Sequence, residues 1–273
     1  MQLKKQLNEM ENIVLTNSKN NLTSNSYVFD GNVVNDNHVS FEINENQNVS
    51  IIFINIKNEL DVNFNVANNS IVKFSFLQVD PVNLSLNGDI KDHANLICYY
   101  ADFTKGNVKL VTDINLVGLE AECTWNLASL TSNKDNKEFD VSMYLRNLKT
   151  VAHINNYGVA RDESKLFFSG ICHIINGAHE SKAHQNSKIM VFDEHSDAVA
   201  KPILKIDDND IEASHAAVVG KISDDHMFYL TSKGLSENEA RELITYGYLK
   251  PILNGFDDEK LQERISSLIE GGI

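Results

Sequence analysis

Short runs in which apolar and polar residues alternate follow one another from about residue 33 onwards. Typical runs are HVSFEI, NVSIIFINI and NVKLVTDINL, and the residues that separate such runs are mostly Asn, Asp, Gly and Lys. A period of two with many Val, Ile and Phe residues is typical of β-strands. No helical pattern of ten or more residues interrupts the series. The sequence therefore predicts a mainly β core over residues 33–223.

The spacing of these runs favours a solenoid. Successive runs start roughly every 10 to 12 residues, which fits a sandwich, a barrel or a β-solenoid. Tight hairpins favour Asn-Gly or Asp-Gly turns, but such pairs occur only at Asp30-Gly31, Asn87-Gly88, Asn176-Gly177 and Asn254-Gly255. A solenoid turns through wider corners and therefore needs fewer Asn-Gly or Asp-Gly pairs. Each coil would then hold two strands, although the pattern alone leaves the sandwich and the barrel open.

The period changes at the two ends of the chain. From residue 224 onwards the pattern is helical: Ser236 and Glu239 form a predicted capping box, Pro251 interrupts the run, and LQERISSLIEG forms a last amphipathic helix. We therefore expect a C-terminal helical subdomain over residues 224–273. Near the start, apolar residues at helical spacing over residues 2–15 predict a short helix. Residues 1–32 are expected to form a helical or irregular segment.

Charge and cysteine content narrow the function classes. The net charge is −14 and the sequence pI is near 5, so nucleic acid and anionic membrane surfaces are not expected partners. No stretch resembles a signal peptide or a membrane span, which predicts a cytoplasmic protein. The three cysteines Cys98, Cys123 and Cys172 are scattered and form no CxxC pair. We expect buried, reduced thiols.

The chain offers no self-contained catalytic motif. P-loop, G-x-S-x-G and G-x-G-x-x-G patterns are all missing from the sequence. The acids Asp207, Asp208 and Asp210 lack the spacing of a calcium loop, so a solvated acidic turn is the expectation. Several histidines lie in the same third of the chain without metal-binding spacing, and we expect solvated loop positions for them: His153, His173, His179, His184 and His195.

A long series of fixed spacings near the C-terminus carries a family resemblance. It comprises Pro202, Leu204, Ile206, Asp208, Asp210-Ile211, Ser214-His215-Ala216-Ala217, Gly220, Phe228-Tyr229-Leu230 and Ser232-Lys233-Gly234-Leu235. This series resembles the C-terminal core of the SufB/SufD proteins, the scaffold subunits that assemble iron–sulfur clusters with the ATPase SufC, and it is closer to SufD. The resemblance is strong over residues 151–253. Before residue 151, only the predicted architecture is similar to the family.

The resemblance implies a fold and a site. SufB and SufD cores are right-handed parallel β-helices, and the full proteins are longer, so this chain is expected to have a reduced N-terminal region. In the family, the histidine that His215 matches lies where SufB and SufD meet and the nascent cluster forms. We therefore expect His215, Ser214 and Asp210 at this seam, with His215 as a candidate iron ligand.

One position departs from the family pattern. Some members carry Cys two residues before the histidine, where this chain has Ala213. Iron–sulfur clusters are held mainly by thiolates. We therefore expect no stably bound cluster, and instead a transient cluster shared with a partner that supplies the sulfur ligands. Whether the Ala marks a lost function or a division of labour stays open.

The resemblance also implies partners. In the family the C-terminal tail binds SufC, so the apolar and aromatic residues of the tail are the expected ATPase-binding set: Phe228, Tyr229, Leu230, Leu243, Tyr246, Tyr248 and Leu249. The same helices could cap an open solenoid end. A SufB-like subunit or a second copy of the chain is expected at the seam, and the sequence does not decide between heterodimer and homodimer.

Together these observations predict a non-catalytic scaffold subunit of a SufBCD-type complex. Two alternatives remain. One is a β-solenoid interaction module without assembly activity. The other is a polysaccharide-binding or polysaccharide lyase β-helix, which is less expected because the tail motif has no place in that class.

Overall fold

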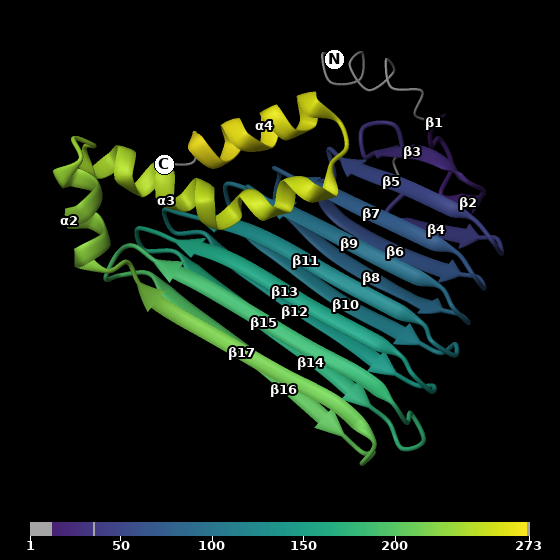
Figure 1. The fold of residues 1–273 in the computed structure, drawn as a ribbon. Coiled ribbons are helices and arrows are strands. Elements are labelled where there is room, and N and C mark those ends of the chain that lie inside the picture. The colour runs from purple at the N-terminus through teal and green to yellow at the C-terminus, as the bar shows by residue number, and fades with distance from the viewer. Residues whose placement is uncertain (1–12, 35, 272–273) are drawn as a thin grey trace.

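The computed structural model describes residues 13–34 and 36–271, and these form two parallel β-sheets wound into a solenoid with helices along one side (Figure 1). Sheet A has nine strands: β1 (Ile13–Val14), β3 (Asn25–Asp30), β5 (Asn48–Ile54), β7 (Ile71–Gln78), β9 (Asn95–Asp102), β11 (Glu122–Thr131), β13 (Val151–Ala160), β15 (Ser181–Val191) and β17 (Ile211–Lys221). Sheet B has eight: β2 (Lys19–Leu22), β4 (His38–Ile43), β6 (Asn58–Val66), β8 (Val82–Ile90), β10 (Val108–Leu116), β12 (Asn136–Leu145), β14 (Lys165–Ile174) and β16 (Asp197–Ile206).

The order of strands within each sheet confirms the predicted parallel β-helix. Odd-numbered strands follow one another in sheet A and even-numbered strands in sheet B, so each coil gives one strand to each sheet. The coils widen along the chain. Val49 pairs with Val72, 23 residues later, whereas Ala152 pairs with Ala183, 31 residues later. This arrangement excludes the sandwich and the barrel.

One corner of the solenoid is built from residues in the left-handed conformation. A column of them follows the coils: Asn46, Asn69, His93, Glu120, Lys149 and Glu180. The N–H of each donates to a carbonyl of the following coil, as in Asn69 to Asp92 and Glu180 to Asp210. Asn adopts this conformation more readily than most residues, and it occupies the first corners, where the coils are shortest.

The interior changes in character as the coils widen. Aromatic rings run along it from the narrow coils, where Phe53 stacks on Phe76 with ring centroids 4.1 Å apart, to the contact between Phe139 and Phe168 in the wider ones. Farther along, the buried inner positions include small residues such as Ala152 and Ala183. All of these belong to one continuous core.

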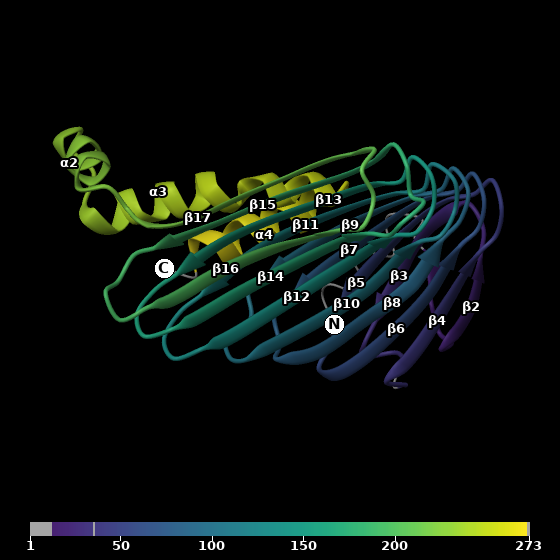
Figure 2. The ribbon, with the colours of Figure 1, turned by 90° about the horizontal axis from the view of Figure 1, so that it is seen from below.

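Helices follow the last strand, and all but the first of them lie across the outer face of sheet A. They are α2 (Asp224–Ser232), α3 (Glu237–Leu249), the 3₁₀-helix η2 (Lys250–Gly255) and α4 (Glu259–Glu270). Ser236 caps α3 in the predicted capping box with Glu239, which is confirmed. A second apolar cluster joins α3, η2 and α4 to the C-terminal halves of the sheet A strands. Figure 2 shows these helices on the sheet A side only.

The N-terminal segment differs from its expectation where the structure describes it. The predicted helix over residues 2–15 lies almost wholly outside the described residues, and its last part, Ile13–Val14, forms β1. Strands β2 and β3 follow within residues 1–32, because β3 pairs in register with β5 from Asn25↔Val49 onwards. Backbone pairing with the next coil thus overrides a polar local sequence. Within the described ranges, none of the helices has the length and apolar content needed to span a bilayer.

Candidate functional site at the open end of the solenoid

The last coil, formed by β16 and β17, ends both sheets. Among the described residues, β16 pairs with β14 and β17 pairs with β15, and neither has a second neighbour in its sheet. Apolar side chains of the inner face are uncovered here, including Val219, which pairs with the buried Ile189 and is 43% exposed. Both strands lie at the lower left edge in Figure 1. The open end therefore presents two strand edges and an uncovered interior.

His215 lies on the inner face of this last coil. It is the register partner of Gln185, a buried inner-face residue whose amide nitrogen donates to the carbonyl of Ile203 at 2.9 Å. His215 is nevertheless exposed, because no further coil covers it. Ala213 lies two residues before it on the same face of the strand. A cysteine at that position would therefore be next to His215.

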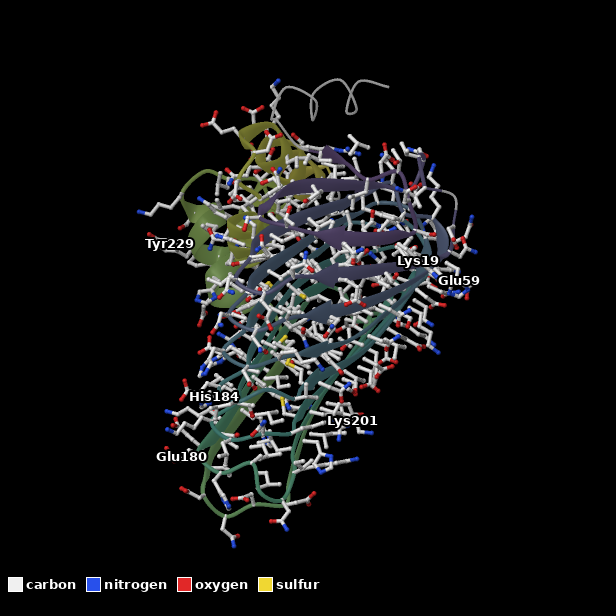
Figure 3. The ribbon with its side chains drawn as sticks, turned by 90° about the vertical axis from the view of Figure 1, so that its right-hand side faces the viewer. Lys19, Glu59, Glu180, His184, Lys201 and Tyr229 are labelled. Carbon is white, nitrogen blue, oxygen red and sulfur yellow. The ribbon has the colours of Figure 1, made fainter. Side chains whose placement is uncertain are left out.

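Ser214 faces the other way. Successive residues of a strand point to opposite faces, so Ser214 lies on the outer face of sheet A. There its hydroxyl is 2.7 Å from Nδ1 of His184 on β15. The ring of His184 stacks on that of His153 with centroids 5.3 Å apart. Figure 3 shows His184 and Lys201 on opposite sides of the solenoid near its wide end.

Asp210 lies at the corner before β17 and not beside His215. The two are five residues apart along an extended segment, which corresponds to about 16 Å. The N–H of Asp210 donates to Asp208 at 3.0 Å, and its carbonyl accepts from the N–H of Glu180 at 2.6 Å. Of the three predicted seam residues, His215 and Ser214 are thus neighbours on opposite faces, and Asp210 is a corner residue.

The acidic turn is more than a solvated loop. Asp208 is buried, and its carboxylate accepts the N–H of Asp210, the N–H of Gly177 at 2.9 Å and Nδ1 of His179 at 3.0 Å. The hydrogen bond from the Asp210 N–H, followed by those from Gly177 and His179, lowers the pKa of Asp208. Likewise, Nε2 of His173 is 2.7 Å from Asp207. The expectation of purely solvated acids and histidines is wrong here. The Asp-x-Asp spacing of 208 and 210, which suits a side chain accepting a backbone N–H two residues on, was the available signal.

The three cysteines are free and buried, as predicted. Burial raises the pKa of the Cys172 thiol to about 12 and also raises the pKa of Cys98 and Cys123. They are therefore thiols, not thiolates, at neutral pH. Among the residues that the structure describes, no three His, Cys, Asp or Glu side chains are grouped so that they could hold a metal ion.

The predicted ATPase-binding residues fall into two groups. Phe228 is 74% exposed, and Tyr229 and Leu243 are more than half exposed. Figure 1 shows α2, which carries the first two, beyond the end of β17 and away from the sheets, and Figure 3 shows Tyr229 at the surface. These three side chains are available to a partner.

The other residues of the set hold the tail in place. Leu249, the last residue of α3, is fully buried. Tyr248 packs edge-on against Tyr157 of β13, with ring centroids 6.0 Å apart. Tyr246 is half-buried, and its hydroxyl is 3.4 Å from that of Ser266. Leu230 lines an apolar cavity of about 430 Å³ between α2, α3 and the ends of β15 and β17. Packing against the solenoid and the other helices accounts for Tyr246, Tyr248 and Leu249, whereas Leu230 faces the cavity.

Comparison with known proteins identifies one matching family. Residues 27–248, well over half of the chain, match the family model "SUF system FeS cluster assembly, SufBD core domain". The match runs from β3 through nearly all of α3. It therefore covers the solenoid from β3 onwards, its open end and the first part of the helical tail.

Individual relatives match over a shorter stretch. The chain is 36% identical to the iron–sulfur cluster assembly protein SufD of Bacillus subtilis over 118 residues, which are 43% of this chain and 27% of the relative. It is 25% identical to SufD of Escherichia coli over 111 residues, 41% of this chain and 26% of the relative. A SufBD family protein of Methanothermobacter thermautotrophicus is 33% identical over 112 residues, 41% of this chain and 27% of the relative. The matched stretch thus spans about a quarter of these relatives.

Proposed function

The chain belongs to the SufB/SufD family of iron–sulfur cluster assembly proteins, and from this premise we propose that it is a non-catalytic scaffold subunit of an assembly complex. The observation that carries the proposal is the family match over residues 27–248, which includes both the open last coil and most of α3. The cluster is the cargo of such a complex. The scaffold presents ligands and surfaces, while a separate ATPase supplies the energy of nucleotide binding and hydrolysis.

The exposed part of the tail is the proposed docking surface for a SufC-type ATPase. It consists of Phe228 and Tyr229 on α2 and Leu243 on α3. Aromatic side chains are enriched among the residues that contribute most to binding at protein interfaces. Tyr246, Tyr248 and Leu249 contribute indirectly, because their packing fixes α3 on sheet A and thereby positions the docking surface.

The open end of the solenoid is the proposed seam for a second subunit, which is either a SufB-like chain or another copy of this one. Unpaired edges of β16 and β17 and the exposed Val218 and Val219 suit pairing with another chain. His215 would be a ligand from this side. The thiolates that a cluster needs would come from the partner, because the three cysteines of this chain are buried.

The docking surface is tested by co-purifying the chain with the SufC-type ATPase of the same organism. We expect a stable complex and a raised ATPase rate. The double variant Phe228→Ala/Tyr229→Ala is expected to weaken binding about tenfold or more. Val111→Ala, which truncates an exposed apolar residue on sheet B, is the matched control and should bind normally. Absence of a complex with the unmodified chain would overturn the scaffold proposal.

The seam is tested by cluster assembly in the reconstituted complex. His215→Ala is expected to reduce cluster formation while leaving ATPase binding intact. His195→Ala removes an exposed histidine from the turn before β16 and serves as the control. Intact assembly with His215→Ala would favour a solenoid interaction module in which this histidine has no ligand role.

A further inference from the structure

The first C-terminal helix, α2, is packed differently from the helices that follow it. Every side chain of α2 whose burial the structure describes is exposed or half-buried, whereas α3 buries Ala240, Thr245 and Leu249. The apolar cluster that joins α3, η2 and α4 to sheet A contains no described residue of α2. A helix of 9 residues depends on packing for its stability. The position of α2 is therefore weakly fixed.

Two hollows lie on opposite faces of α2. The apolar cavity of about 430 Å³ is lined by His226, Tyr229 and Leu230, which share one face because they are three and four residues apart. A second hollow of about 530 Å³ lies against the other face, at Phe228 and Thr231. Space on both sides leaves α2 room to move.

The two hollows differ in their chemistry. The walls of the cavity opposite α2 are mainly apolar and include Ile189, Val218 and Ile244 from β15, β17 and α3. The second hollow is bordered by charged groups, among them Lys221, which is paired with Glu194 at 3.2 Å. Apolar side chains gain free energy when they leave water for an apolar environment, whereas charged pairs at a surface stay hydrated. Movement of α2 into the apolar cavity is therefore the favoured direction.

The links at both ends of α2 permit this movement. Only Ile222 and Ser223 separate α2 from β17, and Ser223 makes no side-chain capping hydrogen bond. At the other end, Gly234 has a φ of 101°, and no atom lies within 4 Å of the place that its Cβ would take. Hinges consist of a few residues at the ends of elements that absorb changes in φ and ψ. Short links of this kind allow α2 to turn as a unit.

We propose that α2 is a hinged flap with two positions. In the open position, seen in this structure, Tyr229 is 59% exposed. In the closed position Tyr229 and Leu230 fill the apolar cavity. A closed flap withdraws Tyr229 from the docking surface, so the free chain holds this surface back and the ATPase binds the open form. That consequence rests on the proposed function, whereas the flap itself does not.

Fluorescence quenching in the full chain measures the position of the flap. Tyr229→Trp places an indole on the cavity side of α2, and Phe228→Trp places one on the opposite face as a reference. Trp125, the single tryptophan of the chain, is fully buried, so acrylamide quenches mainly the added indole. If the flap is open for about a third of the time, quenching at position 229 is about threefold weaker than at position 228. This is the expected result.

Filling the cavity tests whether closure is the cause. Gly220 lines the cavity, and a Cβ added there meets no atom within 4 Å, so Gly220→Leu occupies the space without displacing its neighbours. We expect quenching at position 229 to rise about threefold, to the level at position 228. Gly247→Leu is the matched control, because Gly247 has the same free space but is exposed on α3 and does not line the cavity. It should leave the quenching unchanged.

Binding of the SufC-type ATPase tests the consequence for docking. Gly220→Leu keeps the flap open, so we expect it to tighten binding about threefold, the inverse of the open fraction. Unchanged affinity would overturn this consequence. Weaker binding would do the same, because it would mean that the cavity receives a side chain of the ATPase. Failure of the unmodified chain to bind would count against the proposed function, and quenching would still decide whether the flap closes.

Two outcomes would overturn the flap itself. One is equal quenching at positions 228 and 229, which would show that α2 keeps the position seen in this structure. The other is a response to Gly247→Leu as large as the response to Gly220→Leu, because the change would then not come from the cavity. Circular dichroism and the melting temperature of each variant confirm that the solenoid is intact.

Discussion

The inner coils and the last coil are built from the same alternating sequence pattern but differ in burial. Along β12, inner-face side chains are buried and outer-face ones are partly exposed. Along β16, which has the same pattern, every residue is exposed or half-buried. The difference arises because β12 has a neighbour on each side and β16 has one. The comparison teaches that a coil acquires its core from the coils beside it, so the last coil keeps its inner face exposed.

The inner coils should respond most strongly to the loss of an interior aromatic side chain. Phe76 is fully buried between Phe53 and Tyr100, with centroids 4.1 Å and 5.5 Å away. Phe76→Ala would leave a cavity in a rigid stack, and we expect the free energy of unfolding to fall by about 3–5 kcal/mol. Urea denaturation followed by circular dichroism measures this. A loss below about 1 kcal/mol would mean that the narrow coils can collapse around the gap.

Breaking a buried ion pair should lower the free energy of unfolding by nearly as much. Lys137 and Asp102 are both fully buried, with Nζ 2.8 Å from Oδ2, and Nζ also donates to the carbonyl of Leu130 at 2.7 Å. Lys137→Met would leave an uncompensated buried carboxylate, so we expect a loss of about 3 kcal/mol. Adding Asp102→Leu removes that charge and should restore most of the stability. If the double variant were as unstable as the single one, the pair would matter for packing rather than for charge.

Matched leucines on the two kinds of coil sharpen the comparison. Leu110 is buried on the inner face of β10, and Leu204 is half-buried on the inner face of β16. We expect Leu110→Ala to cost about 3 kcal/mol and Leu204→Ala about 1 kcal/mol, since less apolar area is lost at the open end. Thermal and urea denaturation of the two variants test this. Equal losses would show that the last coil is as well packed as the inner ones.

The smallest effect expected on stability comes from the acidic corner of the last coil. Because the pKa of Asp208 is lowered in the folded state, first by the N–H of Asp210, its contribution to stability is present above the ordinary Asp pKa. That contribution is lost as the pH falls through the folded-state value. Asp208→Asn should therefore be less stable than the unmodified chain at pH 7, and the difference should be smaller at pH 3, below the ordinary Asp pKa. Urea unfolding at the two pH values measures the difference, and a gap that stays constant with pH would contradict it.

Much of the architecture was readable in the sequence. The period-two runs predicted the strands, and Ser236 with Glu239 predicted the start of α3. The spacing of the runs and the scarcity of Asn-Gly turns favoured two strands per coil, and the family resemblance supported this over a sandwich or a barrel. These features depend on local chemistry: alternation follows from strand geometry, and a capping box satisfies N–H groups three residues apart. The match of a series of spacings around His215 likewise identified the family.

Only the tertiary structure decided which of the predicted residues are available and which are packed. Ser214 and His215 are adjacent in sequence but face opposite sides, and Asp210 belongs to a corner held by Asp208 and Glu180. In the tail, exposed and buried residues share the same apolar character in the sequence. Exposure depends on what lies beside a residue after folding, and those neighbours often belong to another coil, as Glu180 does for Asp210. The sequence by itself favoured a chain that winds into coils, whereas the end of the stack determined which side chains stay exposed.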